Sequence, residues 1–116
     1  MALSPHDIES QRFTPVRLRH GYEMSAVDEL LDQASAAHTA LIQENDDLEA
    51  RRVDPREVPG GPATMRVMRP EAVREARFEQ VRWREGYDIG EVDDFLAAVE
   101  ASLRELHQRN DALHRG

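Results

Sequence analysis

The chain has 116 residues, of which 33% are charged and 5% aromatic, and it carries 23 acidic against 15 basic residues for a net charge of −8. This balance argues against general nucleic-acid binding, and the absence of cysteine excludes disulfides and thiolate chemistry. No apolar run is long enough to span a bilayer, and the first residues lack the basic and apolar regions of a secretion signal. Such a composition favours narrow apolar stripes on helices over a thick globular core.

One segment of the chain occurs twice. The sequence FTPVRLRHGYEMSAVDELL at 13–31 returns without a gap as FEQVRWREGYDIGEVDDFL at 78–96, a constant offset of 65 (78 − 13). A duplicated segment predicts a duplicated structural unit. We therefore expect a first repeat at 1–51, a proline- and glycine-rich linker at 52–68 and a second repeat at 69–116.

A short helix is expected at the start of each repeat. Ser4 can cap the first one, Pro5 suits its first position, and Asp7 lies near the positive end of the helix dipole. In the second repeat Pro70 keeps this pattern, but Arg69 is a poor cap.

An arginine-rich turn follows each short helix. Gly21 and Gly86 are expected to supply a positive φ for the chain reversal. The turns place an apolar side chain between two guanidinium groups, which suits a membrane interface because tryptophan prefers the headgroup level and arginine is attracted to anionic lipid. The candidate membrane-binding residues are Arg17, Leu18, Arg19, Arg82, Trp83 and Arg84.

The turns also have a purely structural interpretation. Leu18 and Trp83 could pack against the base of the long helices. Their neighbouring arginines would then be solvated or paired with Glu85 and Glu23.

A long helix is expected to end each repeat. Asp88 and Glu91 have the spacing of a capping box at the start of the second long helix, whereas Ser25 with Asp28 is expected to cap the first. Apolar residues then recur with a seven-residue period, as in the seam of a left-handed coiled coil. The predicted interface residues are Val27, Leu30, Leu31, Ala34, Leu41, Leu48, Val92, Phe95, Leu96, Val99, Leu103, Leu106 and Leu113.

The predicted fold is therefore all-α, with two repeats of short helix, turn and long helix, and with the long helices paired as a short parallel coiled coil. The competing interpretation is an amphipathic helix packed on a globular core. A helix over 25–51 is about 40 Å long, and a linker of this length can reach about 60 Å, so the second repeat can start beside the first. Pairing within one chain and pairing in a homodimer both remain open, and linkage favours the former.

The remaining polar and aromatic residues do not predict an enzyme. The recurring aromatics Phe13, Phe78, Tyr22 and Tyr87 are expected to form a small core between short and long helices, and Asp28 and Asp93 to lie in first helical turns. The acidic stretch Glu44, Asp46, Asp47 and Glu49 is interpreted as a solvated helix end. The five histidines have no metal-ligand spacing, and no nucleotide or nucleophile motif occurs, so neither a metal nor another cofactor is expected.

Both repeats carry a pattern that resembles the N-terminal domain of the DivIVA family. In the first repeat the residues are Leu3 to Ile8, Phe13, Thr14, Gly21, Tyr22, Val27, Asp28 and Leu31, and in the second they are Pro70, Phe78, Gly86, Tyr87, Val92, Asp93, Phe95 and Leu96. The chain is similar to the tandem DivIVA-domain proteins of actinobacteria.

This resemblance implies a cytoplasmic scaffold. Family members dimerise as parallel coiled coils with turns that cross near the tip, and they collect on the inner face of the membrane at cell poles and division septa. There they recruit division or wall-synthesis proteins. The residues that would insert into the membrane correspond here to Leu18 and Trp83. A soluble regulatory module that binds protein partners without lipid contact is the alternative function.

Overall fold

A computed structural model describes residues 2–50 and 67–115 and shows the two repeats as matching units. The first repeat contains helix α1 (Pro5–Glu9), strands β1 (Pro15–Val16) and β2 (Gly21–Tyr22), and helix α2 (Met24–Glu49). The second contains α4 (Pro70–Glu75), β3 (Gln80–Val81), β4 (Gly86–Tyr87) and α5 (Ile89–Arg115). The expected linker at 52–68 lies outside the described residues except for Val67 and Met68, which pack against the core.

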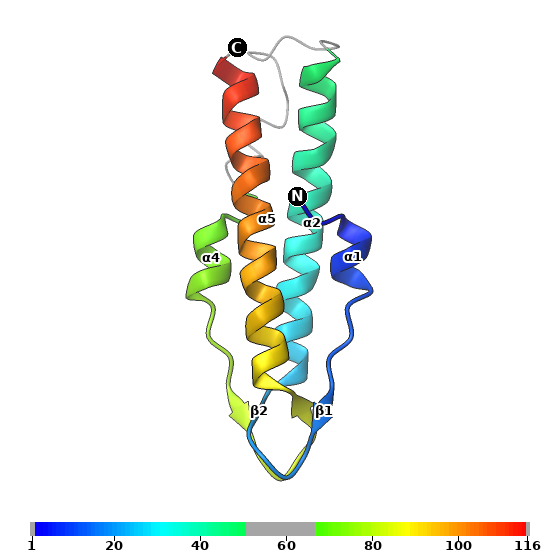
Figure 1. Cartoon of the computed structure of the whole chain (residues 1–116), viewed down its shortest axis with the longest axis vertical. Coiled ribbons are helices and arrows are strands. Elements are labelled where there is room, and N and C mark those ends of the chain that lie inside the picture. The colour runs from blue at the N-terminus through cyan, green and yellow to red at the C-terminus, as the bar shows by residue number, and fades with distance from the viewer. Residues whose placement is uncertain (1, 51–66, 116) are drawn as a thin grey trace.

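The two long helices lie side by side and run in the same direction (Figure 1). Both start next to the strands, and α1 packs on α2 just as α4 packs on α5, so the short helices flank the central pair. The predicted predominance of helix is confirmed. The expectation of a chain without strands is wrong, because the strands, of two residues each, pair into a small antiparallel sheet at one end.

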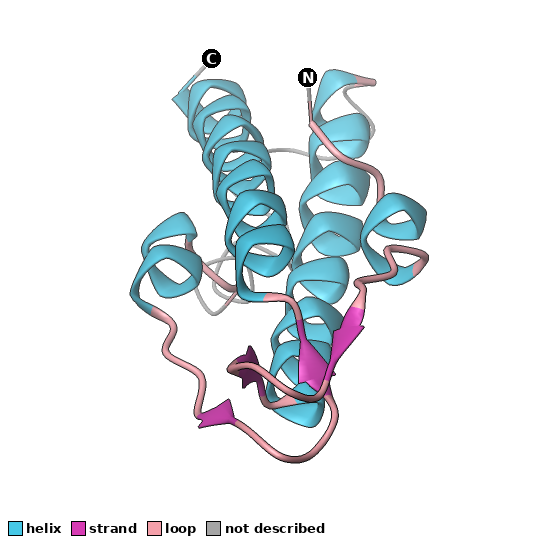
Figure 2. Ribbon diagram, turned by 60° about the horizontal axis from the view of Figure 1, so that its bottom comes forward, coloured by secondary structure: helices cyan, strands magenta, loops and turns pink. Residues whose placement is uncertain are grey.

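The sheet is built by exchange between the repeats. Its strand order is β1-β4-β2-β3, so β1 pairs with β4 and β2 pairs with β3, while β2 and β4 meet in the middle. Each strand before a turn thus pairs with the strand after the other repeat's turn. The two turns cross, and neither repeat has a strand hairpin of its own (Figure 2).

The core runs between the long helices. Its members are almost all apolar, and the fully buried ones from α2 and α5 are Val27, Ala34, Leu41, Val92, Val99 and Leu103. Ile8 of α1 and Val73 of α4, at equivalent positions of the two repeats (8 + 65 = 73), extend the core outward. Burying each large apolar side chain contributes about 1.5–3 kcal/mol, so this stripe is the main source of stability.

Polar side chains are buried along the same contact. His38, which is fully buried, bonds to the Ser102 hydroxyl at 2.7 Å through Nε2 and to the Ala34 carbonyl at 2.8 Å through Nδ1. Further toward the helix C-termini, Asn110 donates to the Asn45 side-chain oxygen at 3.0 Å. All buried polar side-chain atoms in the described residues have a partner, so the core is polar in places without an unpaired group.

The helix caps differ in part from expectation. Ser4 and Asp7 form the predicted reciprocal cap of α1, and Arg69 makes no side-chain cap bond. At α2 the expected caps Ser25 and Asp28 are wrong, because the Glu23 carboxylate accepts from the backbone N–H groups of the first turn.

At α5 only half of the predicted capping box forms. Asp88 accepts from the Glu91 N–H at 3.0 Å. The Glu91 carboxylate, however, does not turn back to the cap; it binds Thr14 of the other repeat instead.

Candidate functional site

The turns project from one end of the helix pair and carry the two exposed large apolar side chains. Leu18 is 78% exposed and Trp83 is 74% exposed, and these are the large hydrophobic residues that the described structure leaves open to solvent. The alternative in which they pack against the base of the long helices is therefore wrong. Figure 2 shows the crossed turns at this end.

Backbone bonds between the repeats hold the turns in place. The Trp83 N–H donates to the Arg17 carbonyl at 3.1 Å, which joins one turn to the other. Just behind the turns, Glu23 N–H donates to the Glu79 carbonyl at 2.9 Å and Asp88 N–H donates to the Thr14 carbonyl at 3.0 Å. The tips are thus fixed relative to each other by contacts that neither repeat can make alone.

Gly21 and Gly86 act differently from the expectation. Neither has a positive φ. A Cβ on Gly21 would lie 2.8 Å from the Tyr87 carbonyl oxygen, and one on Gly86 would lie 2.9 Å from the Tyr22 carbonyl oxygen. Glycine is required here because two backbones cross in contact, not because the chain reverses.

The left-handed residue of the turns is Trp83, with φ of 72°. This conformation costs a residue with a side chain on the order of 1–2 kcal/mol. It persists because the paired strands on both sides fix the backbone. The Arg82 guanidinium lies 4.9 Å from the centre of the indole ring and covers it by a cation–π contact.

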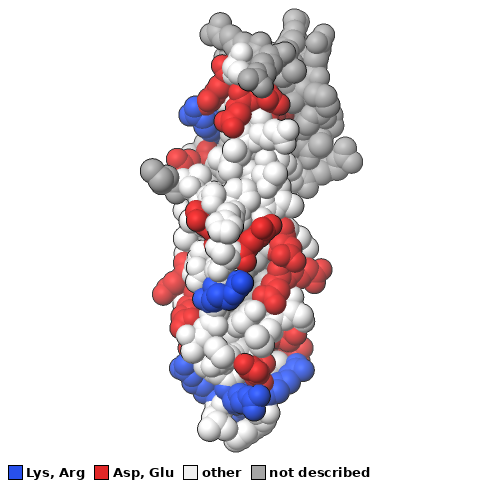
Figure 3. Space-filling view, turned by 90° about the vertical axis from the view of Figure 1, so that its right-hand side faces the viewer, with Lys and Arg blue, Asp and Glu red and all other residues white. Residues whose placement is uncertain are grey.

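Arginines surround the apolar end of the molecule. The chain contains no lysine, and Figure 3 shows positive side chains gathered in a band just above an uncharged apex. The four arginines of the turns, Arg17, Arg19, Arg82 and Arg84, are all exposed.

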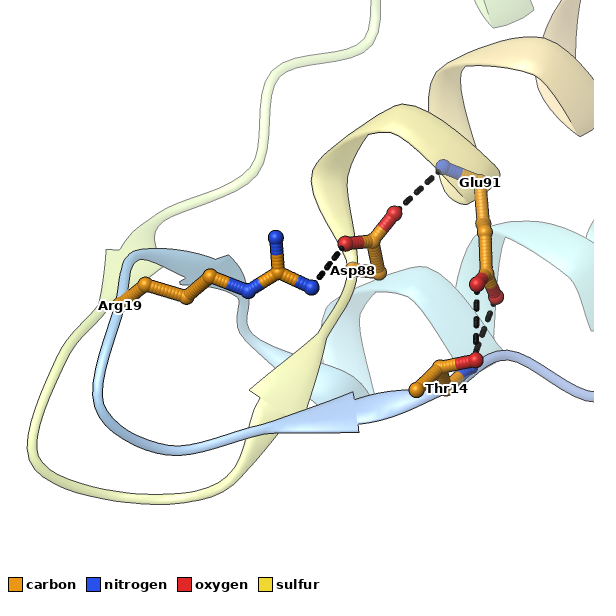
Figure 4. Close-up of polar contacts among 4 residues, drawn as sticks. All are labelled: Thr14, Arg19, Asp88 and Glu91. Atoms are coloured by element: carbon orange, nitrogen blue, oxygen red, sulfur yellow. Dashed lines mark hydrogen bonds and ion pairs between the residues drawn. The ribbon is translucent and has the colours of Figure 1, made fainter.

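Two of these arginines reach acids of the other repeat. Arg19 contacts Asp88 at 2.7 Å, as Figure 4 shows, and Arg17 lies 3.7 Å from Glu85. On the opposite side the positive charge of Arg84 helps to lower the pKa of Glu23, after hydrogen bonds from Ser25 and Ala26. The acids at this end orient the guanidinium groups without covering the apex.

A symmetric cluster forms the base of the turns. The Tyr22 hydroxyl donates to Asp93 and the Tyr87 hydroxyl donates to Asp28, each at 2.7 Å. Burial, followed by these carboxylates, raises the pKa of Tyr22 and raises that of Tyr87 to about 12. Asp28 and Asp93 thus bind the other repeat, which the sequence interpretation as first-turn residues missed.

The aromatic cluster also differs from expectation, because its pairs join the repeats. Phe13 lies 5.1 Å from Tyr87, and Phe78 lies 5.2 Å from Tyr22, measured between ring centroids. Phe13 further contacts Phe95 at 5.9 Å. Each short-helix segment is therefore anchored on the partner repeat as well as on its own long helix.

The structure places the predicted interface residues along the helix pair. Those that are buried are Val27, Leu31, Ala34, Leu41, Leu48, Val92, Leu96, Val99, Leu103 and Leu106, while Leu30, Phe95 and Leu113 are half-buried.

Sequence reasoning missed the polar residues of this interface. Asn45 and Asn110 occupy equivalent positions and are both buried, and this recurrence was the available signal. Glu44, interpreted as part of a solvated helix end, is also buried and accepts from Asn110 at 3.0 Å.

The described residues offer little for other kinds of site. In residues 2–50 and 67–115, no three His, Cys, Asp or Glu side chains gather closely enough to hold a metal ion. None of the helices over the same residues has both the length and the apolar character needed to cross a membrane.

The chain matches no protein-family model, no curated protein and no solved structure.

Proposed function

We propose that the protein is a non-enzymatic scaffold or adaptor that contacts an anionic membrane surface through its crossed turns. The observation that carries the proposal is the pair of exposed apolar residues, Leu18 and Trp83, at one end of the molecule and within a band of arginines. A tryptophan and a leucine that remain in solvent have no role in the core, and their neighbours carry the charge that anionic lipid attracts.

The energies support contact at this end despite the negative charge of the whole chain. Each arginine close to an anionic surface contributes about 1 kcal/mol, and apolar burial adds about 25 cal/mol per Å². At physiological salt, charges beyond about 8 Å are largely screened. The acids further along the helices therefore weigh little, even with a net charge of −8. Glu23, Glu85 and Asp88 lie beside the turn arginines and reduce their attraction to lipid. Burial of Leu18 and Trp83 therefore has to supply much of the energy.

In this proposal the two long helices form a short parallel coiled coil whose task is to hold both turns together. The seven-residue period and the buried stripe of Val27, Ala34 and Leu41 against Val92 and Val99 support such packing. A paired tip doubles the lipid contact of a single turn. The outer faces of the helices would then recruit protein partners, and the DivIVA resemblance implies division or wall-synthesis proteins at the inner face of the cytoplasmic membrane.

Vesicle sedimentation tests this function. The chain should pellet with vesicles of phosphatidylglycerol and phosphatidylcholine, and the variant Leu18→Ala/Trp83→Ala should stay in the supernatant. Because both side chains are exposed, the variant should keep the circular dichroism spectrum and the unfolding midpoint of the parent.

A matched pair of charge variants gives the control. Arg84→Glu at the tip and Arg115→Glu at the far end of α5 change the net charge equally, and both residues are exposed. Only Arg84→Glu should weaken binding. Equal pelleting of the double alanine variant and the parent would refute lipid contact and leave the soluble protein-binding module as the better account.

A further inference from the structure

We propose that the two repeats are built to pair only as unlike partners, so that each repeat rejects a second copy of itself. The natural competitor of the observed arrangement is a dimer of chains in which first repeat pairs with first repeat and second with second. The repeats match at an offset of 65, so every residue in one repeat has an equivalent in the other. For each contact between the repeats, this equivalence tells which two residues would face each other in the competing dimer. The inference concerns repeat pairing and is independent of lipid contact.

Charges near the C-terminal ends of the long helices carry the inference. Glu49 pairs with Arg109, and Glu44 pairs with His114 at 3.3 Å. The two contacts are equivalent, because Glu44 corresponds to Arg109 and Glu49 corresponds to His114 (44 + 65 = 109; 49 + 65 = 114).

Like pairing would lose both contacts and, between two first repeats, would set acid against acid. Two first repeats would bring Glu44 against Glu49 twice, and two second repeats would bring Arg109 against His114 twice. Facing charges of this kind select partners in parallel helix pairs, because the attraction in one pairing becomes repulsion in the other.

A buried hydrogen bond also favours pairing of unlike repeats. His38 bonds to Ser102, and the equivalent positions in the other repeat are Leu103 and Ala37 (38 + 65 = 103; 37 + 65 = 102). In a pair of first repeats the buried imidazole of His38 would therefore face Ala37, which has no polar side-chain atom. A buried polar group without a partner disfavours that pairing strongly.

The contact behind the turns adds a third preference. Thr14 donates to Glu91 through its backbone N–H at 2.8 Å and through its hydroxyl at 2.7 Å. At the equivalent positions Glu79 corresponds to Thr14 and Ala26 to Glu91. Two second repeats would set Glu79 against Glu91, and two first repeats would lose both bonds.

Several contacts do not distinguish the partners. The tyrosine–aspartate bonds and the Asn45–Asn110 pair join residues that are identical in both repeats, so they would form in any parallel pairing. They define the shape and register of the module. The choice of partner lies in the unlike contacts above. The Arg17–Glu85 contact is also unlike, but it would be lost between two first repeats and replaced by Arg82 with Glu85 between two second repeats.

Disulfide trapping in the full chain tests the inference, because the chain has no cysteine of its own. Cysteine is placed at Asn45, at Asn110, or at both, and the proteins are oxidised mildly at micromolar concentration. In the double variant Asn45→Cys/Asn110→Cys, position 45 should cross-link with position 110, as peptide mapping will identify. Each single variant should remain free of covalent dimer.

Either of two results would overturn the inference. A single variant that oxidises largely to a covalent dimer would show that like repeats face each other. A double variant without a 45–110 cross-link would show that the unlike repeats do not pair.

Charge exchange in the same full chain tests the residues that make the choice. Arg109→Glu sets two glutamates face to face, as in a like pair, and should lower the unfolding midpoint and raise the covalent dimer of the Asn45→Cys chain. Adding Glu49→Arg restores opposite charges between the unlike repeats and should recover most of the unfolding midpoint. The covalent dimer should stay raised, because Glu49→Arg would also face Glu44 favourably in a pair of first repeats. If the unfolding midpoint does not recover in the exchanged variant, these charges do not determine which repeats pair.

Discussion

Crossing of the two turns requires glycine at positions 21 and 86, and substitution by alanine tests this requirement. The added Cβ of Gly21→Ala would lie 2.8 Å from the Tyr87 carbonyl oxygen and 2.7 Å from a Val16 methyl group. The methyl group can rotate away. The carbonyl belongs to a strand that is paired on both sides, so it moves only if the sheet opens.

The magnitude follows from this overlap. Because Gly21 has no positive φ, alanine suffers no backbone strain there, and the cost is steric. Overpacking of this kind costs about 1–3 kcal/mol. With a urea m-value of about 1–3 kcal/mol per molar for a small protein, the midpoint should fall by about 1 M. Gly86→Ala should behave alike, because its Cβ would lie 2.9 Å from the Tyr22 carbonyl oxygen.

Gly90 in α5 provides the control for the urea titration. Its added Cβ would meet nothing closer than Asp88 Oδ2 at 3.5 Å, which is ordinary contact. Alanine in a helix is favoured over glycine by about 0.5–1 kcal/mol, so Gly90→Ala should raise the midpoint. If Gly21→Ala and Gly90→Ala shifted the midpoint equally, the backbones would not cross as described.

Two further predictions concern titration. Burial lowers the pKa of His38 from its ordinary 6.5, and the nearby His107 lowers it further, so the unfolded chain binds the proton more readily. Stability should therefore fall as the pH drops through about 6.5; His38→Gln should weaken this dependence of the urea midpoint, whereas the exposed His20→Gln should not. Because burial and the two carboxylates raise the pKa of both tyrosines, that of Tyr87 to about 12, phenolate absorbance should appear at higher pH in the folded chain than in the chain unfolded in urea. Ionisation at the same pH in both states would mean that the hydroxyl groups are neither buried nor bonded to Asp28 and Asp93.

The helices of this chain could be predicted because their signals are local. The period of Val27, Ala34, Leu41 and Leu48 marks one face of one helix, and Ser4 with Asp7 marks a start within four residues. Such patterns depend only on residues close in sequence, so they can be recognised without knowledge of the tertiary contacts.

The sheet could not be predicted, because its strands have two residues each and pair with the other repeat. No alternation of apolar and polar residues is visible over so short a length. For the same reason the partners of Glu91 and Asp28 were missed. A capping box is the usual reading of Asp88 and Glu91, yet Thr14 from the other repeat competes for the carboxylate.

The candidate site was located from sequence by residue type, while its geometry required the structure. Arginines around Leu18 and Trp83 recur in both repeats, which drew attention to the turns. From the sequence we expected the glycines of the turns to adopt the left-handed conformation, whereas Trp83 adopts it. The difference arises because paired strands fix the backbone around the turn, and that tertiary constraint outweighs the local preference for glycine.

Fluorescence of Trp83 tests the central claim most directly, since it is the single tryptophan of the chain and is 74% exposed at the tip. Anionic vesicles added at physiological salt should shift its emission to shorter wavelength and protect it from a water-soluble quencher, while phosphatidylcholine vesicles should not. An emission spectrum unchanged by saturating anionic vesicles would contradict the proposal that the crossed turns meet lipid.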